Sequence, residues 1–325
     1  EQEGCHPADL LRPAEPLQRH LAPNPAPPCL GARAGRAFLP VAARKDDIAR
    51  RDGVEQLHFL AREGQLMKAV YDVWAEEVSD PPPSKYLVVS RRTCSVPLLA
   101  NLDDVLALGK GDYYLNTASN YLLERFGLTL SDSAWSELQT ELNVGRDTQV
   151  EVRNGNLAVL EPVLTKLAET IFKQAEQERE ALTLYLKTMG LMGGQRNAVV
   201  DVGYGATIQN YLCKLTGQKL NGYYLATDER SIPVAEQHGV IVRGCLMHNV
   251  EHSLAAPIMY LRSFELEKLL SSSDGQVVKY TSKDGVNVEA HYRELSVQER
   301  DGDAFRNDLR NGVLQFARDA VRVRT

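Results

Sequence analysis

Three short segments carry residue types that suit the binding of a phosphate group. They are Arg62-Glu63-Gly64, Ser90-Arg91-Arg92, and Gly203-Tyr204-Gly205-Ala206-Thr207, the last of which follows Asp201. A guanidinium group can hold a phosphate through two parallel hydrogen bonds. Glycines let the backbone approach a ligand closely, and the free N–H groups at the start of a helix attract an anion. We therefore expect the three segments to bind a phosphorylated ligand.

Two carboxylates in these segments are candidate catalytic groups. Glu63 could coordinate Mg²⁺ or orient Arg62, and either Glu63 or Asp201 could accept a proton from a reacting hydroxyl. Each segment also has a structural alternative, because glycines after a strand often form only a turn and adjacent charges often form surface ion pairs. Successive side chains of an extended segment point to opposite faces, so we expect one of Arg91 and Arg92 to reach the ligand.

The elements around these segments predict a parallel sheet. Residues 56–61 form a strand, Leu66, Val70, Trp74 and Val78 mark one face of a helix, and "KYLVVSRR" forms a second strand. "NAVVDVGYGATIQNYL" and "LNGYYLATDER" repeat this order after a long interval. Strand-helix-strand units imply parallel pairing, which brings the three segments to one edge of the sheet. We expect an α/β fold with a Rossmann-like parallel sheet flanked by helices.

The rest of the chain divides into three regions. Residues 1–48 are rich in proline and predict a linker or extended arm, followed by a transferase-like α/β domain over 49–325. Residues 100–190 have helical spacing and predict a large insertion that could cover a pocket. The last 75 residues predict a helix in "RSFELEKLLSS", a hairpin around "QVVKYTSKDGVNVEAHY" and a terminal helix from about Asp303.

Composition excludes several classes of function. A net charge of −6 and a pI near 5.7 argue against nucleic-acid binding. The sequence has no apolar run long enough for a transmembrane helix. Its five cysteines lack CxxC spacing, which favours a reduced, cytoplasmic setting and argues against a metal held by protein side chains alone.

Several other polar residues give weaker signals. Asp228 follows a strand, where capping the next turn is its commonest use. Glu265, Glu267 and Lys268 fit a solvated helix face, and the tyrosines of "GDYYLNTASNYLLERFG" fit the core or the rim of a site.

A resemblance to a known family rests on three segments taken together. They are "LHFLAREGQLMKAVYDVW", "KYLVVSRR" and "VVDVGYGATIQNYL", the last followed by "GYYLAT". They resemble the domain that follows a haloacid-dehalogenase-like phosphatase domain in large bacterial surface-polysaccharide biosynthesis proteins, over residues 50 to 320. The resemblance implies a phosphatase-like domain in the same longer protein, joined through the proline-rich arm. It also implies a cytoplasmic location, peripheral to the inner membrane through other polysaccharide enzymes.

A more distant resemblance is to type I phosphoribosyltransferases. Arg62-Glu63-Gly64 matches their pyrophosphate loop, Asp201 one of their ribose-binding acids, and Gly205-Ala206-Thr207 the end of their phosphate loop, whereas Val202 stands where they have a second acid. The resemblance implies transfer of a 5-phosphoribosyl group from phosphoribosyl pyrophosphate, with Mg²⁺, to a glycan acceptor such as an O-antigen or capsule precursor.

Two alternatives stay open at this point. "VVDVGYGAT" also resembles the hydrophobic-Asp-x-Gly-x-Gly motif of S-adenosylmethionine-dependent methyltransferases, in which Asp228 would serve the adenosine ribose. The other alternative is a noncatalytic scaffold that binds a glycan or a protein and neither donor.

Overall fold

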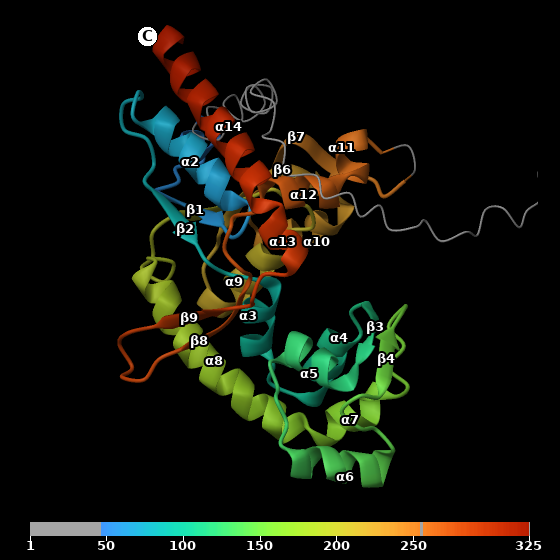
Figure 1. Cartoon of the computed structure of the whole chain (residues 1–325). Coiled ribbons are helices and arrows are strands. Elements are labelled where there is room, and N and C mark those ends of the chain that lie inside the picture. The colour runs from blue at the N-terminus through green and yellow to red at the C-terminus, as the bar shows by residue number, and fades with distance from the viewer. Residues whose placement is uncertain (1–46, 254–255, 325) are drawn as a thin grey trace, which may run out of the picture.

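The central sheet of the protein is parallel, as expected. A computed structural model describes residues 47–253 and 256–324 (Figure 1). Five strands follow the order β2-β1-β5-β6-β7 and all pair in parallel. Their bounds are β1 Gln56–Leu60, β2 Ser84–Leu87, β5 Asn197–Asp201, β6 Asn221–Asp228 and β7 Val242–Val250. The protein is therefore an α/β protein with a Rossmann-like sheet.

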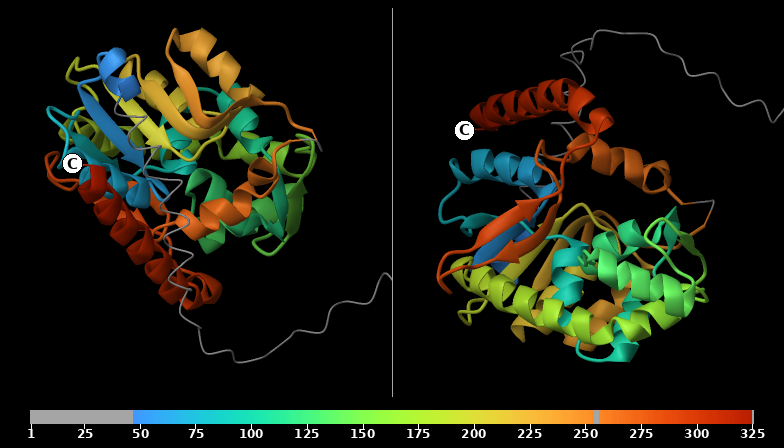
Figure 2. Two further views of the ribbon diagram at one scale, coloured as in Figure 1. Left: turned by 90° about the horizontal axis from the view of Figure 1, so that it is seen from above. Right: turned by 60° about the horizontal axis from the view of Figure 1, so that its bottom comes forward.

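Helices cover both faces of this sheet because successive apolar side chains of a strand point to opposite faces. Ala198 and Val200 of β5 face α2 (Gly64–Ala75) and α14 (Asp303–Arg324), whereas Val199 faces the opposite layer. That layer contains α9 (Thr207–Thr216), α10 (Ile232–His238) and the C-terminal half of α8 (Ala168–Thr188). Figure 2 shows α14 along α2 on one side and α8 on the other. The two-residue period of the strands thus produces the two helical layers.

The insertion between β2 and β5 has its own hydrophobic core. Its elements are α3 Arg91–Ser95, α4 Leu102–Gly109, β3 Tyr113–Thr117, α5 Ala118–Phe126, α6 Asp132–Leu142, β4 Gln149–Val152 and α7 Leu160–Lys166. Tyr113 and Tyr121 are buried in that core, whereas Tyr114 is exposed. Helix α8 joins the two cores, because Ile171 packs in the insertion and Leu182 packs under the sheet.

The C-terminal region is as expected. Helices α11 (Ile258–Leu261) and α12 (Ser263–Leu270) precede a hairpin of β8 (Val277–Thr281) and β9 (Glu289–Tyr292). The short helix α13 (Val297–Asp301) then leads into α14, which starts at Asp303. The hairpin packs beside α8 and against the loop after β2, where the Tyr280 hydroxyl donates to the Val88 carbonyl.

Three details of the structure differ from the sequence-based prediction. The ordered domain extends N-terminal to residue 49, because residues 47–51 are helical and Ile48 is buried; the rest of the predicted arm lies outside the described residues. Helix α2 ends at Ala75 and excludes Val78, since the chain turns at Asp80 before three prolines. The insertion is mostly helical, as predicted, and it also contains β3 and β4, which pair antiparallel. Strand β7 carries a mixed polar pattern and was not predicted.

Candidate functional site

The strand order identifies the position of the site. Counted within the sheet, the order is 2-1-3-4-5, so the direction of the connections reverses between β1 and β5. In open parallel sheets, ligands bind outside the carboxyl ends of the strands at this reversal. The loops after β1 and β5 are those that contain Arg62-Glu63-Gly64 and Gly203 to Thr207. Topology therefore brings together two of the three predicted segments.

The loop after β5 leads into a helix whose first turn has no side-chain cap. The N-cap residue is Ala206, which adopts a left-handed conformation at φ 55° and has no oxygen to accept from the helix. Ala206, Thr207 and Ile208 line the cavity, and no side chain caps the first N–H groups of α9. Gly203 is required for close packing, because a Cβ atom there would lie 2.3 Å from the Ala226 carbonyl oxygen. This loop is built to present backbone N–H groups.

The loop after β1 is held by hydrogen bonds from its own backbone and from the C-terminal region. The Glu63 carboxylate accepts from the Arg62 backbone N–H at 3.1 Å and from the Ser271 hydroxyl at 2.6 Å. Gly64 begins α2 against β1, where a Cβ atom would lie 2.9 Å from the Phe59 carbonyl carbon. Glu63 does not pair with the Arg62 guanidinium, contrary to one expectation. That guanidinium donates to Glu299 at 3.2 Å and to the Asp274 carbonyl at 3.4 Å.

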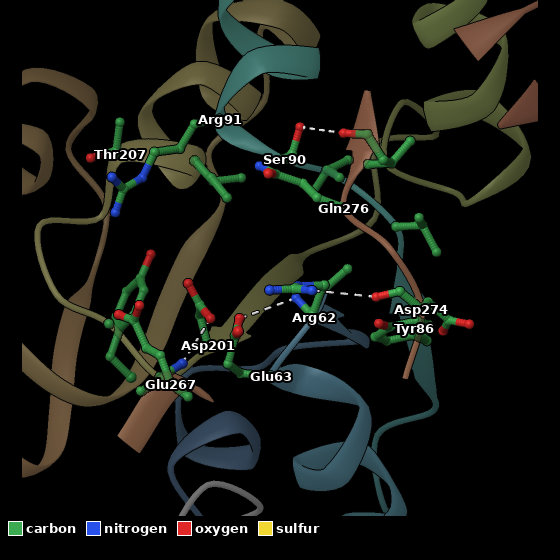
Figure 3. A pocket seen from close by; sticks show the side chains of 18 of the residues that line it. Arg62, Glu63, Tyr86, Ser90, Arg91, Asp201, Thr207, Glu267, Asp274 and Gln276 are labelled. Carbon is green, nitrogen blue, oxygen red and sulfur yellow. Dashed lines mark hydrogen bonds between the residues drawn. The ribbon is translucent and has the colours of Figure 1, made fainter. Parts of the chain in front are cut away.

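Only one of the two adjacent arginines lines the cavity. Ser90 caps α3, so Arg91 and Arg92 lie in the first turn of a helix and diverge by helical rotation instead of strand alternation. Arg91 is exposed and lines the cavity (Figure 3). Arg92 points into the insertion and forms a buried ion pair with Glu178 at 2.6 Å. Of the two arginines, one of which we expected to reach the ligand, Arg91 is therefore at the cavity, and Arg92, although it was a candidate donor-binding residue, is not.

Ser90 has a structural role that the sequence did not indicate. Its hydroxyl accepts from the Thr93 backbone N–H and donates to the Val277 carbonyl at 2.8 Å. The residue is buried, although it lines the wall of the cavity. Its side chain therefore joins α3 to β8. These contacts favour a structural role for Ser90 over the predicted binding of a donor.

The three segments meet at one cavity of about 280 Å³. Arg91 and Thr207 lie on one side of it, Arg62 lies on the other, and Asp201 and Glu63 lie between them (Figure 3). Asp201 is half-buried and its Oδ1 accepts from the Val202 N–H at 2.8 Å. The volume is near the lower end of the range for small-molecule sites, about 300 Å³. A compact, charged ligand fits such a space.

The helical insertion does not cover this cavity beyond its first residues. Its cover comes from the C-terminal region, through Glu267 of α12, the segment Asp274 to Val277 and Tyr292 of β9. Burial raises the pKa of Tyr86, which also lines the cavity, to about 12. The insertion, which could have covered a pocket, instead buries its apolar faces in a core of its own.

Glu267 was not predicted as a site residue. The expected solvated face holds for Glu265, which is exposed and pairs with Arg262 at 2.9 Å. Glu267, two residues on, points toward the opposite side of α12 and lines the cavity. Burial raises the pKa of its carboxyl, the nearby Glu63 raises it further, and Arg91 opposes both effects. The period of the helix predicts that the two glutamates point to different sides. It does not predict which of those sides faces the cavity.

Asp228 caps the turn that follows β6, as its position indicated. Its carboxylate is buried and accepts from Arg230 at 2.5 Å and from the Tyr260 hydroxyl at 3.0 Å. These hydrogen bonds hold the pKa of Asp228 below its usual value despite burial. Asp228 does not line the cavity, so it is not placed to bind the ribose of a nucleoside there.

The carboxylates of the cavity fit a magnesium ion that arrives with a ligand. Among the described residues, no three acidic, histidine or cysteine side chains gather to hold a metal by themselves. Mg²⁺ usually keeps several waters and uses one or two carboxylates together with substrate phosphates. Glu63 and Asp201 supply carboxylates of this kind beside two arginines.

Fold and site define a Rossmann-like α/β protein with a charged cavity at the topological reversal of its sheet. No protein-family model matches the chain, and no curated protein matches it either. Within residues 47–253 and 256–324, no helix combines the length and the apolar character needed to cross a membrane.

Proposed function

We propose that the protein is a glycosyltransferase of the phosphoribosyltransferase type. It would transfer a 5-phosphoribosyl group from phosphoribosyl pyrophosphate to a glycan acceptor in bacterial surface-polysaccharide biosynthesis. One observation carries the proposal: an uncapped helix start and an exposed arginine lie on one side of the cavity, an arginine lies on the other, and carboxylates lie between. A ligand with phosphates at both ends, a sugar in the middle and a bound divalent cation matches that order of charges.

The residues have separate roles in this proposal. Gly205, Ala206 and Thr207 hold the 5-phosphate through backbone N–H groups and the Thr207 hydroxyl, assisted by Arg91. Asp201 binds the ribose hydroxyls, and the segment Arg62 to Gly64 binds pyrophosphate. Mg²⁺ bound with the donor would neutralise pyrophosphate, with Glu63 or Asp201 beside it.

The reaction needs no covalent intermediate on the protein. The bond between ribose C1 and the pyrophosphate oxygen breaks, pyrophosphate keeps the electron pair, and the acceptor oxygen forms the new bond to C1. The protein positions the two reactants and stabilises the charge on the departing group. The product retains its 5-phosphate, which a phosphatase-like domain of the same longer protein would remove.

Calorimetric titration tests the proposal directly. We expect phosphoribosyl pyrophosphate with Mg²⁺ to bind, and S-adenosylmethionine to leave the protein unchanged. The buried contacts of Asp228 favour this result, since they leave no acid for an adenosine ribose at its position. Binding of S-adenosylmethionine alone would support a methyltransferase, and binding of neither would support a scaffold.

Replacing Asp201 with Asn then tests the assignment of the site. We expect weaker donor binding with an unchanged melting temperature, because the carboxylate lines the cavity. Replacing exposed Glu265 with Gln provides the matched acidic control and should leave donor affinity as it is. Equal affinity in wild type and Asp201→Asn would remove Asp201 from the site.

A further inference from the structure

A second cavity, of about 470 Å³, adjoins the first. It lies between α12 and α13, and we call it the α12–α13 cavity. Arg62, Glu63 and Glu267 line both cavities, so these side chains form a shared wall. A ligand in the α12–α13 cavity would meet a ligand in the first cavity at this wall.

The lining of the α12–α13 cavity suits a sugar ring. Phe264 is 64% exposed, which leaves much of its flat apolar ring available, and Lys268 Nζ lies 4.3 Å from the centre of that ring. Two polar residues, Gln298 and Ser296, line the same cavity, and the Ser296 hydroxyl also accepts from the Glu299 N–H at the start of α13. A pyranose has apolar C–H faces and hydroxyl groups around its edge, so it matches an aromatic ring surrounded by polar groups.

Glu267 is the carboxyl group of the shared wall that is best placed to take a proton. The Glu63 carboxylate already accepts from the Arg62 N–H and the Ser271 hydroxyl. In the described part of the chain, no group donates a hydrogen bond to the Glu267 carboxylate. Its charged neighbours are Glu63 and Arg91, with Lys268 on the same helix.

We propose that the α12–α13 cavity binds the acceptor sugar, with the sugar ring against Phe264 and the reacting hydroxyl at Glu267. This inference rests on the proposed phosphoribosyl transfer. As the acceptor oxygen bonds to ribose C1, its proton moves to a carboxylate oxygen of Glu267 and pyrophosphate leaves with the electron pair. The neutral carboxyl group then releases that proton to solvent.

Saturation-transfer NMR with methyl glycosides of glucose, galactose and N-acetylglucosamine tests the binding part on the full chain. We expect at least one glycoside to receive saturation in the presence of Mg²⁺ and pyrophosphate. Phe264→Ala should abolish that signal, whereas Ile258→Ala should retain it, because Ile258 is an exposed apolar residue of α11 outside the cavity. Donor affinity should be the same in both variants.

Release of pyrophosphate in the presence of the bound glycoside tests the role of Glu267. We expect Glu267→Gln to lower kcat by about 10²- to 10⁴-fold. Glu265→Gln, on the exposed side of the same helix, should keep the wild-type rate. Full activity in Glu267→Gln, or no saturation of any glycoside by a protein that binds the donor, would overturn the acceptor cavity. Failure of the wild type to bind the donor would instead overturn the proposed function.

Discussion

Replacing Arg91 and Arg92 with Met, one at a time, should separate ligand binding from stability. The two arginines are adjacent in sequence and have the same chemistry, yet they point into different surroundings. Arg91 is exposed at the cavity, whereas Arg92 is 10% exposed and pairs with Glu178, which is 4% exposed. Each variant is thus the matched control for the other.

The magnitudes follow from these surroundings. Loss of a charged hydrogen bond to a phosphate costs about 1.5–3 kcal/mol, so Arg91→Met should weaken donor binding by about 10- to 150-fold. Its free energy of unfolding should change by no more than about 0.5 kcal/mol, because the side chain is exposed. Arg92→Met leaves the buried Glu178 carboxylate without its cation and should lower the free energy of unfolding by about 3–5 kcal/mol.

Urea unfolding measures the stability of both variants, and calorimetry with phosphoribosyl pyrophosphate and Mg²⁺ measures the affinity. Arg92→Met should keep wild-type affinity under conditions where it is folded. An Arg91→Met variant with unchanged affinity would refute the phosphate-binding role of Arg91. An Arg92→Met variant as stable as the wild type would refute the structural role of the buried pair.

Three further results are expected. Burial lowers the pKa of His58 to about 4. The contribution of His58 to the free energy of unfolding is therefore complete above its ordinary pKa of 6.5 and decreases as the pH falls below that value. Urea unfolding should show a loss of about 2 kcal/mol between pH 7 and pH 5 in the wild type and no such loss in His58→Gln. Gly203→Ala should reduce donor binding and lower the free energy of unfolding by about 1–3 kcal/mol, because the φ of Gly203 is 147° and a Cβ atom has no space there. Gly193→Ala is the control: a Cβ atom there meets open space, so this variant should match the wild type in both assays. Glu267→Gln should raise the melting temperature at pH 7 but not at pH 4. The raised pKa of Glu267 means that its ionised carboxylate destabilises the fold only at pH values above the ordinary pKa of a glutamate. An equal gain at both pH values would contradict this reasoning.

The sheet and two of the loops at the cavity could be predicted from the sequence because their signals are local. Short apolar segments that are buried on both faces mark β1 and β5, and Gly203 and Gly205 mark a tight turn into a helix. Parallel pairing then places both loops at one edge, with no need to know any distant contact. The same local reasoning predicted the β8–β9 hairpin and the start of α14.

Contacts between distant segments could not be predicted in this way. Ser90 and Val277 are far apart in sequence, so the hydroxyl that caps α3 gave no sign that it also holds β8. The role of Arg92 depends on Glu178, which lies on a helix that follows the whole insertion. Sequence alone does not distinguish Glu267 from Glu265 on the same helix, because only the fold shows which side of α12 lines the cavity.

The shared wall between the two cavities leaves each cavity with lining residues of its own. Loops at the carboxyl ends of strands form the donor side, and any shift there disturbs the pairing of the central sheet. Residues 262–306 contribute no strand to that sheet, but they line both cavities. Within this segment, Phe264, Lys268, Ser296 and Gln298 line the proposed acceptor cavity and not the first one. Exchange of these four residues should therefore alter acceptor preference while the donor remains the same.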